Sequence, residues 1–142
     1  MRRTTAGDLL AEARRGMRRL EPAEALAVVE RGALLVDTRS CDERAAEGVI
    51  AGALPLPLSV LEWRVDPSLP TWNRHVGGFD RTLIVVCSDG YSSSLAAARL
   101  RSLGYADATD LAGGFRAWKA AGLPVAEAPP PPAGLPGTGD PD

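Results

Sequence analysis

Cys87 and the polar residues that follow it form the segment of this sequence best suited to chemistry. Cys87 directly follows an apolar run at residues 83–86, and the residues after it read Ser-Asp-Gly-Tyr-Ser-Ser-Ser. A loop of this composition can turn its backbone N–H groups inward, and the first turn of a following helix adds further unpaired N–H groups. These donors stabilise a thiolate and lower the pKa of its cysteine. Such a thiolate is suited to attack the outer sulfur of a sulfur donor and to hold that sulfur as a persulfide.

A structural role for Cys87 is the alternative. Free cysteine is among the most buried residue types, so Cys87 could simply close the strand as an apolar thiol. The polar loop immediately after it favours a functional role. Its position does so too, because open α/β sheets place their chemistry where a buried parallel strand ends and a helix begins.

The segments around this loop alternate between strand and helix patterns. Apolar runs at residues 33–37 and 83–86 suit strands covered on both faces, and residues 109–111 suit a further short strand. Helical patterns lie at residues 22–32, 95–104 and 114–122. This alternation predicts an α/β fold with a mainly parallel central sheet and helices on both faces.

Both ends of the chain differ from this central part. Residues 6–20 predict a short helix because they carry apolar side chains at helical spacing: Leu9, Leu10, Ala13 and Met17. From residue 127 the sequence is rich in proline and glycine, which predicts a disordered tail with polyproline II character. We therefore expect a helical extension at residues 1–17, one domain at residues 18–126 and a tail at residues 127–142.

The composition restricts the functions that the chain can have. Its 142 residues carry 16 Lys and Arg against 18 Asp and Glu, so a formal charge of −2 produces no basic field that would attract nucleic acid. The basic residues near the N-terminus are interleaved with acidic ones, which predicts a solvated helix face: Arg2, Arg3, Arg14, Arg15, Arg18 and Arg19. No apolar run is long enough to span a membrane and no signal-peptide core follows Met1, so we expect a cytoplasmic protein without nucleic-acid or membrane partners. Two cysteines and one histidine favour neither a disulfide framework nor a zinc site, and no cofactor is expected.

Several segments, taken in order, resemble the rhodanese-like sulfurtransferase domain. Residues 35–39 read Leu-Val-Asp-Thr-Arg, like that family's strand ending in Asp-x-Arg. Residues 48–53 read Gly-Val-Ile-Ala-Gly-Ala and are similar to its Gly-His-Ile-Pro-Gly-Ala signature. Residues 113–125 resemble its closing Gly-Gly…Trp…Gly-x-Pro-Val stretch. The resemblance spans about residues 20–125, and residues 61–64 and 87–97 are most similar to short, single-domain actinobacterial members.

The resemblance implies a single rhodanese-like domain and a sulfurtransferase. In that activity Cys87 takes a sulfur atom from a donor, which is thiosulfate or a persulfide. A thiol or cyanide acceptor then removes the sulfur, and this acceptor could be a protein. The resemblance also implies that the sulfur is surrounded by the backbone amides of the loop: Ser88, Asp89, Gly90, Tyr91, Ser92 and Ser93. The alternative function is a non-catalytic rhodanese-like binding or sulfur-relay module, which the proline-rich tail and the departures of the loop from the family pattern would suit.

The main departure is at Ser92. The common active loop is C-x-x-G-x-R-S, in which Gly90 and Ser93 fit while Ser92 stands in the place of the arginine. Losing a guanidinium removes a planar bidentate donor that would grip an oxyanion, so thiosulfate is predicted to be a poor donor. The fold family also includes phosphatases with Cys-x-x-x-x-x-Arg. Because Ser93 stands six residues beyond Cys87 and the loop has no arginine, phosphoryl transfer is disfavoured.

Compensating positive charge could come from three other arginines. Arg39 and Arg44 lie just past Asp37 at the end of the first predicted strand, and Arg64 lies in a predicted loop expected near the same sheet edge. Each could lean toward Cys87, or could instead form a salt bridge with Asp37, Glu43 or Glu62. Asp37 itself is expected to brace loops and not to transfer protons.

The remaining candidates carry less weight. Cys41, in a predicted loop, could resolve the Cys87 persulfide, but an ordinary thiol is the favoured interpretation. His75 is a poor candidate for a catalytic base, since an ionised thiol needs none. Tyr91 could shape substrate entry beside the nucleophile or be simply exposed.

Overall fold

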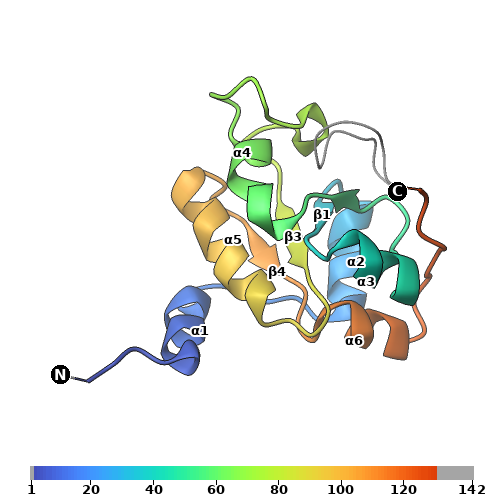
Figure 1. Cartoon of the computed structure of the whole chain (residues 1–142), viewed down its shortest axis with the longest axis horizontal. Helices are drawn as coiled ribbons and strands as arrows, with labels where there is room; N and C mark the ends of the chain where they lie inside the picture. The colour runs from blue at the N-terminus through green and yellow to red at the C-terminus, as the bar shows by residue number, and fades with distance from the viewer. Residues whose placement is uncertain (1, 131–142) are drawn as a thin grey trace.

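A four-stranded parallel sheet lies at the centre of the computed structural model, which describes residues 2–130 (Figure 1). Its strands lie in the spatial order β2-β1-β3-β4. Their bounds are Leu34–Asp37 for β1, Leu54–Pro55 for β2, Leu83–Val86 for β3 and Thr109–Asp110 for β4. The central strands β1 and β3 pair over their whole lengths, with Asp37 opposite Val86. Their carboxyl ends therefore meet at one edge of the sheet, where Cys87 follows β3.

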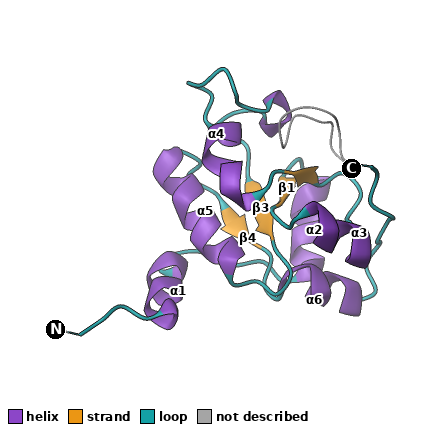
Figure 2. Ribbon diagram, in the orientation of Figure 1, coloured by secondary structure: helices purple, strands orange, loops and turns teal. Residues whose placement is uncertain are grey.

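Helices cover both faces of this sheet (Figure 2). Their bounds are Ala6–Arg14 for α1, Pro22–Glu30 for α2, Cys41–Glu47 for α3, Leu61–Val65 for α4, Ser92–Leu103 for α5 and Gly114–Ala120 for α6, with 3-10 turns at Leu58–Val60 (η1) and Arg74–Val76 (η2). Helices α4 and α5 pack on one face, and α2 and α6 pack on the other. The predicted α/β class, with a parallel sheet covered on both faces, is confirmed.

Alternate side chains of the central strands enter two separate cores. Leu34, Val36, Leu83 and Val85 join the cluster under α4 and α5, whereas Leu35, Ile84 and Val86 join the cluster under α2 and α6. This follows from the two-residue period of a strand. Because both faces are covered, all four positions of β1 and of β3 are apolar, apart from Asp37 at the end of β1.

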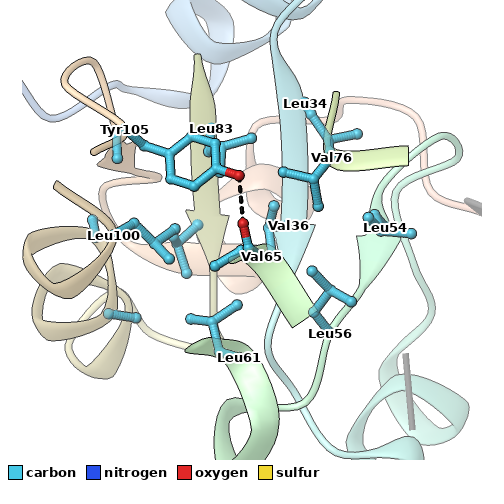
Figure 3. Close-up of a cluster of buried hydrophobic side chains, with 14 of the residues drawn as sticks. Leu34, Val36, Leu54, Leu56, Leu61, Val65, Val76, Leu83, Leu100 and Tyr105 are labelled. Atoms are coloured by element: carbon cyan, nitrogen blue, oxygen red, sulfur yellow. Dashed lines mark hydrogen bonds between the residues drawn. The ribbon is translucent and has the colours of Figure 1, made fainter. Parts of the chain in front are cut away.

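Tyr105 is the large aromatic residue of the first core (Figure 3). Its ring is fully buried among aliphatic side chains, and its hydroxyl donates a hydrogen bond to the backbone carbonyl of Val65 at the end of α4. Burial raises the pKa of Tyr105 to about 12, so the phenol stays protonated and keeps this bond at neutral pH. The bond fixes the end of α4 to the segment that follows α5.

Three local predictions were wrong. The helix predicted at residues 6–20 ends at Arg14, because Arg15 is extended with ψ of 121° and Gly16 follows in a left-handed conformation with φ of 71°. Cys41 lies at the start of α3 and not in a loop. The helix is stabilised by Ser40 at its N-cap, whose hydroxyl accepts from the Glu43 amide while the Glu43 carboxylate accepts from the Ser40 amide. Arg64, expected in a loop, lies in α4.

The ends of the chain complete the description. Residues 127–130 have no helix or strand, and the rest of the predicted tail, residues 131–142, lies outside the described residues. The division into an extension, one domain and a tail therefore stays a prediction. Within residues 2–130, every helix is too short or too polar to cross a bilayer.

Candidate active site

Cys87 lies between β3 and α5, in a loop that holds its sulfur close to backbone N–H groups. The amide of Gly90 donates to Cys87 Sγ at 3.2 Å. Gly90 has φ of 86°, and a Cβ there would lie 2.7 Å from the amide nitrogen of Gly113. Only glycine fits this turn, because any other residue would adopt a strained backbone and collide with the neighbouring segment.

The loop is held from the other side by the start of α6. The amide of Phe115 donates to the Cys87 carbonyl at 2.8 Å, and the amide of Arg116 donates to the Ser88 carbonyl at 3.1 Å. A Cβ at Gly114 would lie 2.5 Å from the Cys87 carbonyl oxygen, so this close approach also requires glycine. The Gly-Gly pair before α6 therefore orients the peptide groups on which the position of Cys87 depends.

The surroundings of Cys87 favour its thiolate. Burial raises the pKa of Cys87, but hydrogen bonds from the hydroxyls of Ser93 and Ser92 and from the amides of Ser93 and Gly90 outweigh it, so the pKa lies below the usual value of a thiol. The Ser93 hydroxyl has a single proton, and it donates to Oδ2 of Asp110 at 2.7 Å. Ser93 can therefore serve only one of these two acceptors at a time.

Cys87 opens into a pocket of about 500 Å³. Its lining comes from three segments, which are the residues between β1 and the first turn of α3, the segment around η1, and the cysteine loop with the start of α5: Thr38, Arg39, Ser40 and Glu43; Pro57, Leu58 and Ser59; Cys87, Ser88, Asp89, Tyr91 and Ser92. Cys87 is 7% exposed, whereas Tyr91 is 63% exposed and stands at the rim. Of the six loop residues predicted to bind substrate, Ser88, Asp89, Tyr91 and Ser92 line the pocket, whereas Gly90 and Ser93 do not.

Of the three arginines proposed to supply charge, Arg39 is the one that lines the pocket within the described residues. It forms a buried ion pair with Asp37, at 2.7 Å from Nη2 to Oδ2, and its guanidinium lies over the Phe115 ring at 4.0 Å. Arg44 Nε lies 3.7 Å from the same carboxylate. Arg64 is buried and donates to the Thr71 carbonyl at 2.6 Å. Within residues 2–130 it meets neither of the alternatives considered for it, since it does not line the pocket and pairs with none of Asp37, Glu43 and Glu62.

The sequence analysis did not place Glu43 at the pocket, and it named Asp89 only for its backbone amide. The Glu43 carboxylate accepts from the Ser88 hydroxyl at 2.8 Å, and hydrogen bonds from the Ser40 amide and from Ser88 hold the pKa of Glu43 below its usual value. Asp89 also lines the pocket and pairs with Arg116 at 2.9 Å. Among residues 2–130, the pocket lining thus carries two carboxylates against the single guanidinium of Arg39.

Two arginines of the predicted solvated face lie at the site instead. Arg14 and Arg19 donate to the carbonyl of Gly90 at 2.9 and 2.8 Å, so that prediction was wrong for them. Arg15 and Arg18 match it, since both are exposed and pair with surface glutamates. Cys41 is exposed, and neither it nor His75 lines the pocket in the described part of the chain.

Comparisons with known proteins place this geometry in a family. A model of the rhodanese-like domain matches residues 21–121. A sulfurtransferase of Allochromatium vinosum is 36% identical over 92 residues, which cover 65% of this chain and 77% of the relative. The thiosulfate sulfurtransferase GlpE of Pseudomonas fluorescens is 35% identical over 102 residues, covering 72% of this chain and 84% of that protein.

A solved structure from Rhodopseudomonas palustris, described as a protein of unknown function and possible tyrosine phosphatase, superposes with a TM-score of 0.78. It is 29% identical, and the match covers 88% of this chain and 98% of that one. The residues that the domain model matches include all four strands, the cysteine loop and α5. The chain therefore belongs to the rhodanese-like family and to its sulfurtransferase class.

Proposed function

We propose that this protein transfers sulfane sulfur from a donor to a thiol or cyanide acceptor through a persulfide on Cys87. The observation that carries the proposal is the Cys87 sulfur, which accepts hydrogen bonds from loop and helix donors and opens into a pocket of about 500 Å³. The names of the two sulfurtransferase relatives support the reaction class. A persistent thiolate needs a reducing compartment, which agrees with the predicted cytoplasmic location.

The reaction proceeds in two displacements at sulfur. In the first, the Cys87 thiolate attacks the outer sulfur of the donor and forms a new S–S bond. The old S–S bond breaks, and its electron pair leaves with a thiolate from a persulfide donor or with sulfite from thiosulfate. In the second, an acceptor thiolate or cyanide attacks the outer sulfur of the Cys87 persulfide and restores the Cys87 thiolate. The Gly90 and Ser93 amides and the Ser92 hydroxyl stabilise the anionic sulfur at both stages.

The charges around the pocket favour a donor of low negative charge. Ser92 offers a hydroxyl where the family pattern has a guanidinium, and the guanidinium of Arg39 is already paired with Asp37. Glu43 adds negative charge to the lining, whereas the carboxylate of Asp89 is paired with Arg116. A persulfide with one negative charge is therefore expected to be a better donor than dianionic thiosulfate, although one relative is named for thiosulfate.

Phosphate-ester hydrolysis, suggested by the description of the Rhodopseudomonas palustris structure, has less support here. Phosphatases of this fold hold phosphate with an arginine six residues after the cysteine, and Ser93 occupies that position. The Glu43 carboxylate of the lining would also repel a phosphate dianion. We do not propose this activity.

The proposal is tested by intact-protein mass spectrometry after exposure to a persulfide donor and, separately, to thiosulfate. Wild-type protein is expected to gain the mass of one sulfur atom, and Cys41→Ser should do the same, whereas Cys87→Ser should not. Loading of Cys87→Ser would exclude Cys87 as the carrier. If no donor loads the wild type, the sulfur-transfer proposal fails, and the non-catalytic binding or sulfur-relay module becomes the better hypothesis.

A further inference from the structure

The segment before the family-matched region makes direct contact with the cysteine loop. The match to the domain model begins at residue 21. Arg14, the last residue of α1, and Arg19, which lies between α1 and α2, both precede it. Helix α1 packs against α5 and contributes no buried residue from Ala6–Arg14 (Figure 1). The contribution of this segment to the site is therefore mainly polar.

Backbone pairing brings Arg19 beside the end of β4. Leu20 forms a parallel bridge with Leu111, and its amide donates to the Asp110 carbonyl at 3.1 Å. The preceding residue, Arg19, then reaches the Asp110 side chain, with Nε at 2.9 Å from Oδ1 and Nη2 at 3.1 Å from Oδ2. Because Asp110 is fully buried, this bidentate ion pair supplies the positive charge that its carboxylate needs.

Both arginines also bind the Gly90 carbonyl. Arg14 Nη2 lies 2.9 Å and Arg19 Nη2 lies 2.8 Å from this oxygen, and Arg14 Nε donates to the Ser94 hydroxyl at 3.0 Å. Gly90 is the residue whose amide donates to Cys87 Sγ. Two charged donors on the carbonyl thus restrict rotation of the residue that presents its N–H to the sulfur.

Asp110 connects the arginines to a second donor of the thiolate. Its Oδ2 accepts from the hydroxyls of Ser93 and Ser94 at 2.7 and 2.8 Å. When Ser93 turns its single proton to the Cys87 sulfur, Arg19 and Ser94 continue to satisfy Asp110. Without Arg19, the buried carboxylate would hold the Ser93 proton more strongly and would place an uncompensated negative charge near the thiolate.

We propose that Arg14 and Arg19 are positioning residues of the Cys87 site, which fix the Gly90 carbonyl and satisfy Asp110 so that the Gly90 amide and the Ser93 hydroxyl serve the sulfur. The inference deepens the proposed function and depends on it only in taking Cys87 as the reacting thiol. The other charged side chains around Cys87 are those that line its pocket: Arg39, Glu43 and Asp89. The substitutions below leave all three in place.

The test is the rate of Cys87 alkylation by iodoacetamide, a neutral probe, measured against pH in a full-length Cys41→Ser background. Arg14→Ala is expected to raise the midpoint of the profile by about half a pH unit and Arg19→Ala by about one unit, a tenfold loss of thiolate well below the midpoint. Arg19→Lys keeps the charge but not the bidentate geometry and should fall between wild type and Arg19→Ala. The matched controls are Arg15→Ala and Arg18→Ala, which remove an exposed charge from the same segment and should leave the midpoint unchanged.

Unchanged midpoints in Arg14→Ala and Arg19→Ala, with only a lower thermal transition, would overturn the proposal by showing a purely structural role. Equal shifts in the controls would also overturn it, because net charge would then explain the effect. If Arg19→Ala does not fold, owing to the unpaired Asp110, the Arg14→Ala profile decides alone, since Arg14 makes no bond to Asp110. Alkylation requires no sulfur donor, so this result is independent of whether the protein loads sulfur.

Discussion

Replacing Glu43 by glutamine should shift the preference of the enzyme toward thiosulfate. Glu43 lines the donor pocket and is ionised at neutral pH, because the Ser40 amide and the Ser88 hydroxyl keep its pKa low. The Ser40 amide binds Oε1 of Glu43 and the Ser88 hydroxyl binds Oε2. Glutamine keeps one oxygen for the Ser40 amide, so the capping box and α3 should be preserved, and its NH2 group can donate to the Ser88 hydroxyl oxygen instead. The change therefore removes one negative charge with little change of shape.

The size of the effect follows from the size of the pocket. A sphere of 500 Å³ is about 10 Å across, so a donor bound in it lies within that distance of Glu43. At about 10 Å and an effective dielectric constant of about 20, each unit of donor charge is repelled by about 1.7 kcal/mol. Exposure of the pocket and dissolved salt reduce this to about 0.5–1 kcal/mol, which is a two- to fivefold effect per unit charge.

The assay compares kcat/KM for thiosulfate with kcat/KM for 2-mercaptoethanol persulfide, both with cyanide as acceptor. Thiosulfate carries one more negative charge, so Glu43→Gln should raise the thiosulfate-to-persulfide ratio by about two- to fivefold, less at high salt. Any change in the Cys87 thiolate affects both donors and cancels in the ratio. Glu47→Gln, on the same helix but outside the pocket lining, is the control. An unchanged or lower ratio in Glu43→Gln would refute the charge argument.

Three further predictions address the loop and the core. The alkylation rate of wild-type Cys87 should rise with pH and level off below the usual thiol value of about 8.5, because its hydrogen bonds favour the thiolate; a midpoint at or above that value contradicts them. Gly114→Ala should lower the free energy of unfolding, measured by urea denaturation, by about 2 kcal/mol more than Gly122→Ala does. Both glycines have positive φ, but only a Cβ at Gly114 would collide with the Cys87 carbonyl, so equal losses would contradict this role of the collision. Tyr105→Phe should cost about 1–2 kcal/mol in the same assay by leaving the Val65 carbonyl unpaired, and a neutral result would show that this bond adds nothing.

The sequence predicted the central strands and the position of Cys87 because both depend on local patterns. Residues 83–86 are a short apolar run followed at once by polar and glycine residues, and the strand β3 has these bounds. Helix α3 was missed because it is largely polar. Ser40 and Glu43, three residues later, nevertheless form a capping box, which is a sequence signal for the start of a helix. That signal would also have placed Glu43 near the start of the helix that borders the pocket.

The partners of the arginines could not be predicted in the same way. Arg14 and Arg19 stand among acidic residues in the sequence, which suggested a solvated face, but they bind groups 71 to 91 residues away. Arg64 was expected at the sheet edge, whereas α4 directs it to the carbonyl of Thr71. Such contacts depend on how distant segments pack, and no period or motif within the segment encodes them.

The central claim, that Cys87 carries sulfur between donor and acceptor, is tested most directly by a single-turnover experiment without free donor. Protein loaded with persulfide is separated from the donor and then mixed with cyanide. We predict that the protein loses the mass of one sulfur atom while one thiocyanate forms per loaded chain, and that Cys41→Ser behaves identically. Retention of the sulfur on the protein, or thiocyanate formation only when free donor is present, would contradict the persulfide mechanism.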